Sequence, residues 1–331
     1  MEIYPRISII TPSFNQGKFL EQTILSVINQ GYPNLEYIII DGGSTDGSVE
    51  IIKRYSRNIA YWISEKDNGQ SAAINKGLTR ATGEIVNWIN SDDYYEPKAL
   101  FKVAEGFRNP EVNIVSGKGR LFKDDVTVGY TKGVDIYEGN LAKSIGWVRM
   151  DQPETFFRKK VIEEIGPLDE RLHYLMDRDW WLKYLLIFGL KGVYQAGDVL
   201  VNFRLHEDSK TVTNKSNFEI DHNSFFYSLA AKNGFPEIAQ FISDTSKIHK
   251  DFYSNIQAKL SREIFKRIFS YYFLLRGNMF YEAGNKRQAE SFYGMVDTMD
   301  LEKEDRVLFR KMKFRNKLPV QVINILRKLT R

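Results

Sequence analysis

The first 90 residues repeat one unit, in which a short run rich in β-branched residues precedes a polar turn and an amphipathic helix. Strands are expected at residues 6–11, 35–40, 59–64 and 84–89. Repeats of strand, turn and helix form a mostly parallel sheet with helices on its faces. Ligands of such sheets bind at the carboxyl ends of the strands. We therefore expect an α/β fold whose functional site is made by the polar turns.

The pattern changes further along the chain. Residues 97–206 mix helical and strand signals, and a closing strand is expected at 192–205. Beyond about residue 211 the strand signals vanish and the sequence is helical in character. We therefore predict two domains, an α/β domain at 1–210 and a helical extension at 211–331.

One stretch of the helical extension has residues at the spacing of a tetratricopeptide helical hairpin. They are Gly277, Phe280, Gly284, Ala289 and Tyr293. Solenoids of this kind need about three repeats. Because the sequence contains one recognisable copy, we expect an ordinary helical hairpin.

The composition excludes several classes of protein. The chain has 331 residues and no cysteine, which rules out a disulfide framework, thiol catalysis, iron–sulfur ligation and Cys-based zinc sites. Residues 1–10 lack the basic region and the apolar stretch of a signal peptide. The apolar run at 268–275 is far shorter than the ~20 residues that span a bilayer. A cytoplasmic protein without a transmembrane helix is expected.

The net charge of +5 is concentrated in the last 26 residues. They contain no acidic residue and nine basic ones, namely Arg306, Arg310, Lys311, Lys313, Arg315, Lys317, Arg327, Lys328 and Arg331. Subtracting these nine leaves a net charge of −4 for residues 1–305. Val320, Ile323, Leu326 and Leu329 recur every three residues beside this charge, as in a helix that lies on an anionic membrane surface.

The segment from Arg306 to Arg331 therefore has two open interpretations. It binds the inner face of the cell membrane, or its apolar face packs on the rest of the helical extension. Nucleic acid is not expected as a partner, because the segment contains no recognisable nucleic-acid-binding module.

Two carboxylates, Asp92 and Asp93, follow the fourth expected strand. Adjacent carboxylates repel unless a cation or solvent lies between them. Mg²⁺ and Mn²⁺ suit such a position, since they bind through one or two carboxylates and the phosphates of a substrate. Taken alone, Asp and Ser in a turn also cap the helix that follows. The other turns must therefore decide between the two interpretations.

Four polar segments occur in a fixed order, TPSFN at 11–15, DGGSTD at 41–46, DNGQSAAINKG at 67–77 and NSDD at 90–93. Together they resemble the inverting family 2 glycosyltransferases, over roughly residues 5–208. The resemblance implies the GT-A fold, which is a Rossmann-like α/β domain with a mostly parallel sheet. It also implies hexosyl transfer from a nucleotide sugar. The dinucleotide fingerprint G-x-G-x-x-G and the P-loop are both absent.

The resemblance also implies which residues bind the nucleotide sugar. They are Thr11, Pro12, Phe14, Asn15, Asp41, Asp67, Asn75, Lys76, Asp92 and Arg204. The residue types suit these roles. An Asp carboxylate accepts a hydrogen bond from N3–H of uracil, a lysine supplies a point charge to phosphate, and an arginine can bind a diphosphate through two N–H groups.

The same resemblance implies the metal ligands. Asp93 corresponds to the second carboxylate of the family's DXD-like motif and is the first expected ligand of Mn²⁺ or Mg²⁺. His206, in a loop after the last expected strand, is a further candidate because a neutral imidazole can bind a metal ion. How Asp92 and Asp93 divide the binding of ribose and metal stays open.

The expected catalytic base is Asp177, which matches the family's Asp at the start of a helix. The Glu that often precedes this Asp is Met176 in this chain. An inverting transfer needs a carboxylate on the acceptor side, where it takes the proton of the attacking hydroxyl. Asp179 is the rival candidate, although an acid in the first turn of a helix also stabilises the helix dipole.

Four residues are expected to contact the acceptor, namely Trp147, Gln152, Glu154 and Trp180. Aromatic rings stack on the apolar faces of sugars, and amides and carboxylates bind the hydroxyl groups. The tryptophans suit a hydrophobic core equally well.

The sequence therefore predicts a metal-dependent inverting glycosyltransferase. Its donor is expected to be UDP-linked, and its acceptor a hydroxyl of a surface polysaccharide or a lipid-linked glycan. Two alternatives stay open. A sugar nucleotidyltransferase would need a triphosphate-binding loop, for which TPSFNQGKF is a poor candidate. A non-catalytic glycan-binding or scaffold protein on the same fold is the other, because the Glu before Asp177 is missing.

Overall fold

The computed structural model describes residues 4–147, 149–207, 215–249, 259–319 and 322. The described strands form one sheet in the order β3-β2-β1-β4-β8-β6-β9-β5, with β7 paired to β6. Their bounds are β1 Ile7–Ser13, β2 Leu35–Asp41, β3 Tyr61–Ser64, β4 Ile85–Trp88, β5 Tyr94–Tyr95, β6 Ile114–Lys123, β7 Val126–Tyr130, β8 Thr155–Arg158 and β9 Val193–Arg204. The four strands expected in the first 90 residues are adjacent and parallel.

The parallel strands align the polar turns. The register pairs Ser13 at the end of β1 with Asp41 at the end of β2, and Asp41 with Ser64 at the end of β3. β8 then runs antiparallel to both β4 and β6, and β9 runs parallel to β6. Because the turns after β1 to β4 leave the sheet at the same edge, they converge there as the sequence predicts.

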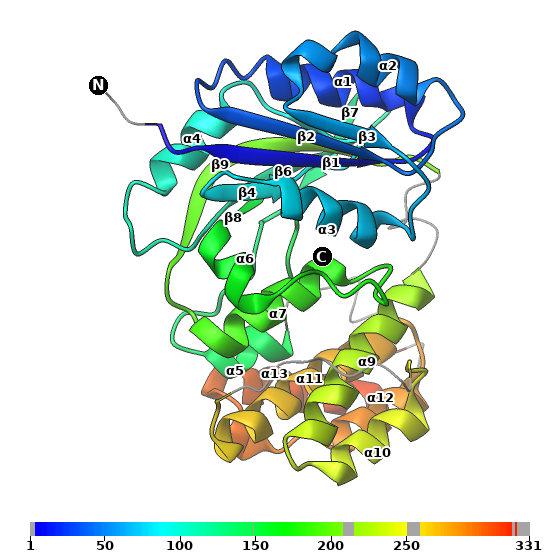
Figure 1. The fold of residues 1–331 in the computed structure, drawn as a ribbon. Coiled ribbons are helices and arrows are strands. Elements are labelled where there is room, and N and C mark those ends of the chain that lie inside the picture. Colours follow the sequence, from blue (N-terminus) through cyan, green and yellow to red (C-terminus); the bar gives the residue numbers. More distant parts are fainter. Residues whose placement is uncertain (1–3, 148, 208–214, 250–258, 320–321, 323–331) are drawn as a thin grey trace.

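Helices cover both faces of the sheet (Figure 1). Their bounds are α1 Gly17–Ile28, α2 Ser48–Arg54, η1 Ser56–Asn58, α3 Gln70–Arg80, α4 Ala99–Gly106, α5 Leu141–Gly146, α6 Lys159–Ile165 and α7 Met176–Phe188. One core joins α1, α2 and α4 to the sheet, and a second joins α3, α6 and α7 to the opposite face. The sequence did not predict the β6–β7 hairpin.

The helical region lies beyond α6 and α7, away from the sheet (Figure 1). It contains α9 Lys215–Lys232, α10 Pro236–Thr245, α11 Arg262–Glu282, α12 Lys286–Gly294, η2 Thr298–Asp300 and α13 Lys303–Lys317. The predicted boundary at residue 210 falls outside the described residues. None of the helices in the described ranges is both long enough and apolar enough to cross a membrane.

The predicted hairpin is formed by α11 and α12. A Cβ atom at Gly277 would lie 2.5 Å from the ring of Tyr293, so the small residue permits the close packing of the two helices. The turn is closed by a hydrogen bond from Asn285 N to Phe280 O at 2.8 Å, with Gly284 at φ 80°. The helical hairpin expected from the residue spacing is therefore present in the structure.

A second hairpin of the same design, α9–α10, lies 50 residues earlier. Phe235 N donates to Ala230 O at 3.0 Å, and Gly234 has φ 79°. The hydrogen-bonded residues and the glycine each lie 50 positions before their counterparts in the α11–α12 hairpin. Only one copy is recognisable in the sequence because the small and the large residue are exchanged in the second hairpin. Tyr227 stands at the position of Gly277, and Ser243 stands at the position of Tyr293.

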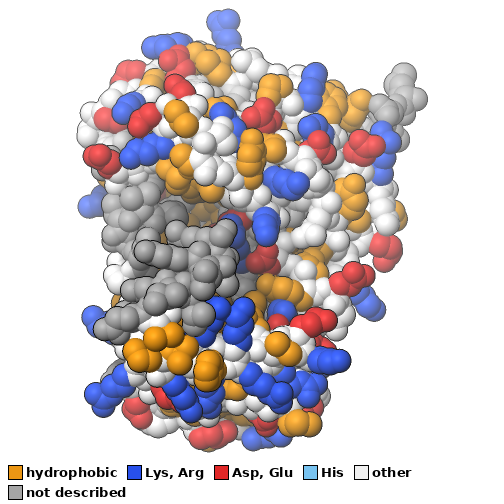
Figure 2. Space-filling view, turned by 180° about the vertical axis from the view of Figure 1, so that it is seen from behind, with side chains coloured by type: hydrophobic (Ala, Val, Ile, Leu, Met, Phe, Trp, Pro, Cys, Tyr) orange, Lys and Arg blue, Asp and Glu red, His pale blue; other side chains and the backbone are white. Residues whose placement is uncertain are grey.

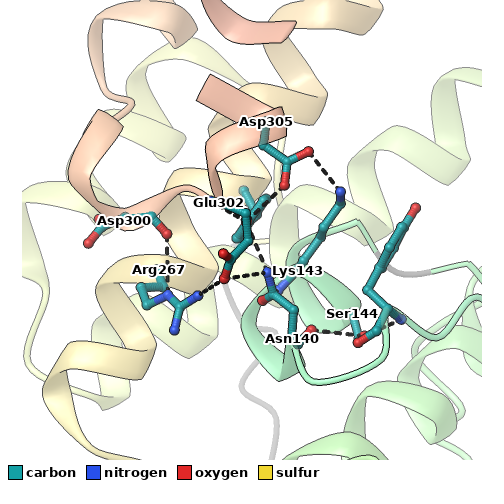
Figure 3. Close-up of polar contacts among 9 residues, drawn as sticks. Asn140, Lys143, Ser144, Arg267, Asp300, Glu302 and Asp305 are labelled. Carbon is teal, nitrogen blue, oxygen red and sulfur yellow. Dashed lines mark hydrogen bonds and ion pairs between the residues drawn. The ribbon is translucent and has the colours of Figure 1, made fainter. Parts of the chain in front are cut away.

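Polar contacts join α5 of the sheet domain to α11 and α13 (Figure 3). Lys143 Nζ lies 2.7 Å from Asp305 Oδ1. Asn140 Nδ2 donates to the Tyr271 hydroxyl at 3.0 Å and to Glu302 Oε1 at 3.3 Å. The core on the α6 and α7 side of the sheet also continues into the helical region. The two parts therefore share one hydrophobic core and are held together by buried polar groups.

Candidate active site

A cavity of about 710 Å³ opens at the carboxyl ends of β1 to β4, and we call it the first cavity. Of the residues predicted to bind a nucleotide sugar, four line it, namely Pro12, Phe14, Asp67 and Asp92, and so does the predicted metal ligand Asp93. The Phe14 ring is exposed at this cavity, where it offers an apolar face of the kind on which a nucleobase stacks. The walls come from four turns that are far apart in sequence, as expected for a parallel sheet.

Two other predicted residues, Asp41 and Thr11, lie behind this wall and shape it. The Asp41 carboxylate is buried and accepts hydrogen bonds from Gly43 N, Ser44 N and the hydroxyls of Ser44 and Ser64, at 2.6–3.1 Å. Thr11 is buried against the Tyr37 hydroxyl at 3.0 Å. Both side chains form their hydrogen bonds with other groups of the protein, because the polar groups of a turn need partners where no neighbouring strand supplies them.

Asn15 joins the turn after β1 to the turn after β2 through two hydrogen bonds. Its Oδ1 accepts a hydrogen bond from Thr45 N at 2.9 Å, and its own backbone N–H donates to the Ser44 hydroxyl at 2.8 Å. Asn15 has φ 51°, a conformation that Asn adopts more readily than most residues. Its observed role is to hold the two turns at a fixed distance.

Asn75 and Lys76 differ most from the prediction. Asn75 exchanges two hydrogen bonds with the backbone of Leu168, each at 3.0 Å, and Lys76 pairs with Glu65. Neither lines the first cavity. The cavity wall of α3 is made by Gln70 and Ala73 in its first turn, whereas Asn75 and Lys76 lie further along the helix and contact Leu168 and Glu65.

Among the residues of the first cavity that were not predicted as binding residues are Lys66, Gln70 and Asn90. Gln70 Nε2 donates to Asn90 Oδ1 at 2.8 Å, so the turns after β3 and β4 are joined at this point. Lys66 adds a cation to the wall. Gln70 and Asn90 lie inside the quoted segments 67–77 and 90–93, and Lys66 directly precedes the first of these segments. The signal that could have found them is their place in the turns between a strand and the next helix.

The two carboxylates at the end of β4 have different environments. Asp93 is buried and accepts a hydrogen bond from Arg204 N at 2.9 Å. Burial and the neighbouring Asp92 raise the pKa of the Asp93 carboxyl well above its usual range. Asp92 Oδ2 lies 2.9 Å from His206 Nε2. A buried carboxylate next to a second carboxylate is costly unless a cation accompanies the pair.

Asp92, Asp93 and His206 fit a divalent cation by their chemistry, although they do not form a closed metal site. No three His, Asp or Glu side chains converge on one point within the described part of the chain. Mg²⁺ and Mn²⁺ commonly use one or two carboxylates and take the other ligands from phosphate and water. The residues present therefore suit a metal ion that is bound together with a diphosphate.

Arg204 connects β9 to this cluster through the protein. Its Nε donates to Asp92 O at 3.0 Å, and its NH2 donates to Gln22 Oε1 at 2.6 Å. The guanidinium lies 4.7 Å from the ring centres of both Phe19 and Phe122. In this conformation Arg204 holds the 92–93 turn in place and does not line the first cavity.

A second cavity of about 320 Å³ adjoins the first, and we call it the second cavity. The two share Gln70, Asn90 and Phe203 as lining residues. The second cavity also contains Asp177, at the first turn of α7. A molecule in the first cavity and another in the second would therefore meet at the residues that both walls share.

Asp177 has the properties of a general base. Its Oδ1 accepts a hydrogen bond from Arg178 N at 2.7 Å. Burial raises the pKa of its carboxyl to about 6, against the opposing effect of the Arg178 guanidinium. A carboxylate with a pKa slightly below neutrality is ionised at pH 7 and is a stronger base than an ordinary Asp. It thus combines the required charge with a position on the cavity wall.

Asp179, the rival candidate, lies outside the second cavity. It is buried, and its Oδ2 lies 2.7 Å from Lys183 Nζ on the next turn of α7. Residues two positions apart on a helix project in nearly opposite directions. Of the two predicted bases, the structure therefore places only Asp177 on the cavity wall.

Most of the residues predicted to contact the acceptor instead contact other residues of the protein. Gln152 lines the second cavity but is buried, and its Nε2 donates to Asn87 Oδ1 and Trp88 O at 2.8 and 2.7 Å. Glu154 is buried beside Thr131 and lines neither cavity. Burial and the charge of Asp151 raise the pKa of Glu154 to about 8, so it is mainly protonated at pH 7.

The two predicted tryptophans also differ from the expectation of an acceptor contact. Trp180 is buried, with its ring centre 5.4 Å from that of Trp88. Trp147 lies at the contact with the helical region, where its Nε1 donates to Tyr271 O at 2.9 Å. The aromatic rings that do line the second cavity include Tyr174 and Phe218. An apolar residue in a helix does not reveal from sequence alone whether it faces a core or a cavity.

Comparison with known proteins agrees with this geometry. Residues 8–166 match the family described as Glycosyl transferase family 2. An uncharacterized glycosyltransferase of Mycobacterium tuberculosis is 30% identical over 190 residues, which cover 55% of this chain and 70% of that protein. The chain therefore belongs to glycosyl transferase family 2 and is a glycosyltransferase.

Two solved structures show the same fold. The crystal structure of S. aureus TarS 1-349 in complex with UDP-GlcNAc covers 94% of this chain and 89% of its own, with a TM-score of 0.60 and 17% identity. The mannosyltransferase PcManGT from Pyrobaculum calidifontis, in complex with GDP-Man and Mn2+, covers 88% of this chain and 74% of its own, with a TM-score of 0.52 and 17% identity. The expected GT-A fold with a helical region after it is confirmed.

Proposed function

We propose that the chain transfers a sugar, with inversion, from a nucleotide sugar in the first cavity to a hydroxyl group in the second cavity. The observation that carries this proposal is the junction of the two cavities, with Asp177 on the wall of the second. Inversion requires the acceptor to attack from the side opposite the departing diphosphate. Asp177 takes the proton of the attacking hydroxyl as the new bond forms.

The donor is a nucleotide diphosphate sugar, and UDP is the proposed nucleotide. Phe14 offers a ring face to the base, and Lys66 offers a positive charge to the phosphates. The UDP-GlcNAc complex of TarS supports a uridine nucleotide, and the GDP-Man complex of PcManGT makes guanosine the competing choice. Both belong in any test of donor selection.

A divalent cation, Mn²⁺ or Mg²⁺, completes the donor site in this proposal. Asp93, with Asp92 and His206 nearby, would hold it, and it would neutralise charge on the departing diphosphate. The support is the pair of adjacent carboxylates at the end of β4 and the Mn2+ in the PcManGT complex.

The acceptor is a hydroxyl of a glycan, either a surface polysaccharide or a lipid-linked glycan. The second cavity combines the rings of Tyr174 and Phe218 with the charged groups of Arg149, Arg178 and Asp177. Rings bind the apolar faces of sugars, and charged groups bind their hydroxyls. This combination suits a carbohydrate better than an apolar or a uniformly charged molecule.

The protein is further proposed to bind an anionic membrane at the inner face of the cell membrane. On α13, the exposed side chains of Val307 and Phe314, 61% and 63% accessible, share one helix face with Arg310, Lys311 and Lys317. Figure 2 shows Lys and Arg side chains gathered over the helical region. Apolar and basic residues on one face suit a surface of anionic lipids.

The opposite face of α13 packs on the protein through Phe309 and Met312. The two interpretations of the basic segment thus apply to different faces of one helix. The amphipathic stretch expected around Val320 to Leu329 lies almost entirely outside the described residues.

A donor-hydrolysis assay tests the proposed activity. With UDP-GlcNAc, UDP-glucose and GDP-mannose in turn, and Mn²⁺ present, the wild type should release nucleoside diphosphate from one of them. Asp177→Asn should lower that rate by about 100-fold or more and leave nucleotide affinity unchanged. Asp179→Asn should keep the rate at temperatures where it is folded, and melt at a lower temperature, because Asp179 pairs with buried Lys183.

The outcomes separate the three classes of function. Formation of nucleoside triphosphate and sugar 1-phosphate that requires pyrophosphate would indicate a nucleotidyltransferase, and no reaction with any donor would indicate a binding protein. Wild-type release by Asp177→Asn would show that another group is the base.

A further inference from the structure

One buried carboxylate of the helical region reaches the segment that carries Asp177. Asp221, on α9, is 2% exposed. Its Oδ2 accepts hydrogen bonds from Tyr174 N at 3.1 Å and Leu175 N at 3.2 Å. Leu175 is the N-cap residue of α7, two positions before Asp177. Backbone amides at the start of a helix have no partner within the helix, so an outside carboxylate is well placed to bind them.

Asp221 is itself held in position. Its Oδ1 lies 3.0 Å from His249 Nε2, and His249 N donates to the Ser224 hydroxyl at 2.7 Å. Ser224 lies one turn after Asp221 on α9. The carboxylate therefore has one oxygen for His249 and the other for the two amides, which leaves it little freedom to rotate.

The same turn of α9 also forms part of the second cavity. Asn217 Nδ2 donates to the Tyr174 hydroxyl at 3.0 Å, and the rings of Tyr174 and Phe218 lie 5.3 Å apart. Tyr174 and Phe218 line the cavity together with Asp177. One helix of the helical region thus fixes the backbone beside Asp177 and supplies a ring to the cavity wall.

We propose that Asp221 is a positioning residue for the catalytic base, so that the helical region forms part of the catalytic centre and is more than an accessory. This inference rests on the proposed function, since it assigns Asp221 a role through Asp177. Asp221 does not line the second cavity and acts by fixing the backbone at 174–175. A general base must be placed accurately, and a misplacement of about 1 Å can lower a rate by about 100-fold.

Steady-state kinetics of donor hydrolysis test this role, with water as the acceptor and the nucleotide sugar that the donor panel selects. Asp221→Ala should lower kcat by about 10- to 100-fold and leave the KM of the donor unchanged, because the first cavity is made by turns of the sheet. Asp221→Asn keeps an oxygen acceptor for the two amides and should retain most of kcat.

Asp300→Ala is the matched control. Asp300 is also a buried carboxylate of the helical region, and its Oδ2 accepts a hydrogen bond from the Ser270 hydroxyl at 2.6 Å. It lines neither cavity. The control should lose thermal stability and keep the wild-type kcat at temperatures where both variants are folded. An equal loss of kcat in both variants would reduce Asp221 to a structural residue and overturn the proposal.

Hydrogen–deuterium exchange gives a second measurement that does not need activity. In Asp221→Ala the amides of residues 173–178 should exchange faster, while those of β1 and β2 should not change. Unchanged exchange at 173–178, or an unchanged kcat, would contradict the proposal. A wild-type protein that releases no nucleotide would instead overturn the proposed function. The exchange data separate that outcome from a failure of the Asp221 contact, because they do not depend on activity.

Discussion

Asp177 and Asp179 lie two residues apart on α7 and have different surroundings. Asp177 faces the second cavity, and Asp179 pairs with Lys183 inside the protein. The sequence could name both because an acid at the start of a helix is a visible signal. It could not choose between them, because the choice depends on which side of α7 faces the cavity, and that is decided by packing against α6 and the helical region.

The raised pKa of Asp177 predicts the acid limb of the rate profile. Because its pKa is about 6, the base is protonated and inactive below that pH and ionised above it. The value of kcat/KM for donor hydrolysis should therefore fall about tenfold per pH unit below pH 6 and level off near pH 7. The Arg178 charge lowers the pKa of Asp177, so Arg178→Gln should move the limb to higher pH.

Arg178→Lys serves as the control for this shift, since it keeps a positive charge at the same position. It should leave the limb close to that of the wild type. A limb that Arg178→Gln leaves in place, or moves to lower pH, would count against Asp177 as the group that titrates.

Asp93 should couple nucleotide affinity to the metal. In calorimetry, Mn²⁺ should strengthen the binding of UDP to the wild type, and Asp93→Ala should weaken binding in Mn²⁺ by at least about tenfold, or about 1.4 kcal/mol. With the metal removed by a chelator, both proteins should bind UDP equally weakly. Equal affinity of the two proteins in Mn²⁺ would remove Asp93 from the metal site.

At the scale of elements, the strands and their order along the chain were predictable because their β-branched runs are continuous and bounded by turns. Which face of each helix points into the site was harder to predict. In α3, Gln70 and Ala73 line the first cavity, whereas the predicted Asn75 and Lys76 contact the protein. A motif fixes which residues are near a site in sequence, and only the rotation of the helix decides which of them point into it.

The outward face of α13 should bind vesicles. In sedimentation with vesicles that contain phosphatidylserine, the wild type should sediment, and the double variant Val307→Ser with Phe314→Ser should bind less, because it loses the apolar part of the face. Each basic residue near an anionic surface contributes about 1 kcal/mol, so neutral vesicles should bind neither protein.

The control for vesicle binding is Val126→Ser, which alters an exposed apolar residue on β7, outside the helical region. It should sediment like the wild type. Equal sedimentation of the α13 variant and the wild type would contradict the proposed membrane surface.

At the scale of the whole molecule, the sheet domain and the helical region act as one body in this account. Their shared core and the contacts around Lys143 and Asp305 hold α5 against α11 and α13 (Figure 3). The sequence predicted a helical region with a separate character, but not this contact. It arises between side chains more than 160 positions apart, and no local pattern in the chain signals such a pair.

Breaking that contact should cost much more than breaking an exposed ion pair. The side chains of Lys143 and Asp305 are 16% and 6% exposed, so Lys143→Met leaves the Asp305 carboxylate buried without its cationic partner and should lower the free energy of unfolding by about 3 kcal/mol. The Lys102–Asp198 pair is 41% and 49% exposed, and Lys102→Met should cost less than about 1 kcal/mol. Denaturant titration compares the two, and equal effects would contradict a buried polar contact between the domains.

In the proposed reaction a donor and an acceptor meet where the first and second cavities join. A crystal structure with the selected nucleotide sugar and Mn²⁺ would show this meeting point. We expect the diphosphate beside Asp92 and Asp93, the base near Phe14, and the anomeric carbon at Asn90 and Gln70, with its open face toward Asp177. A nucleotide sugar bound elsewhere, or one whose anomeric carbon faces away from Asp177, would contradict it.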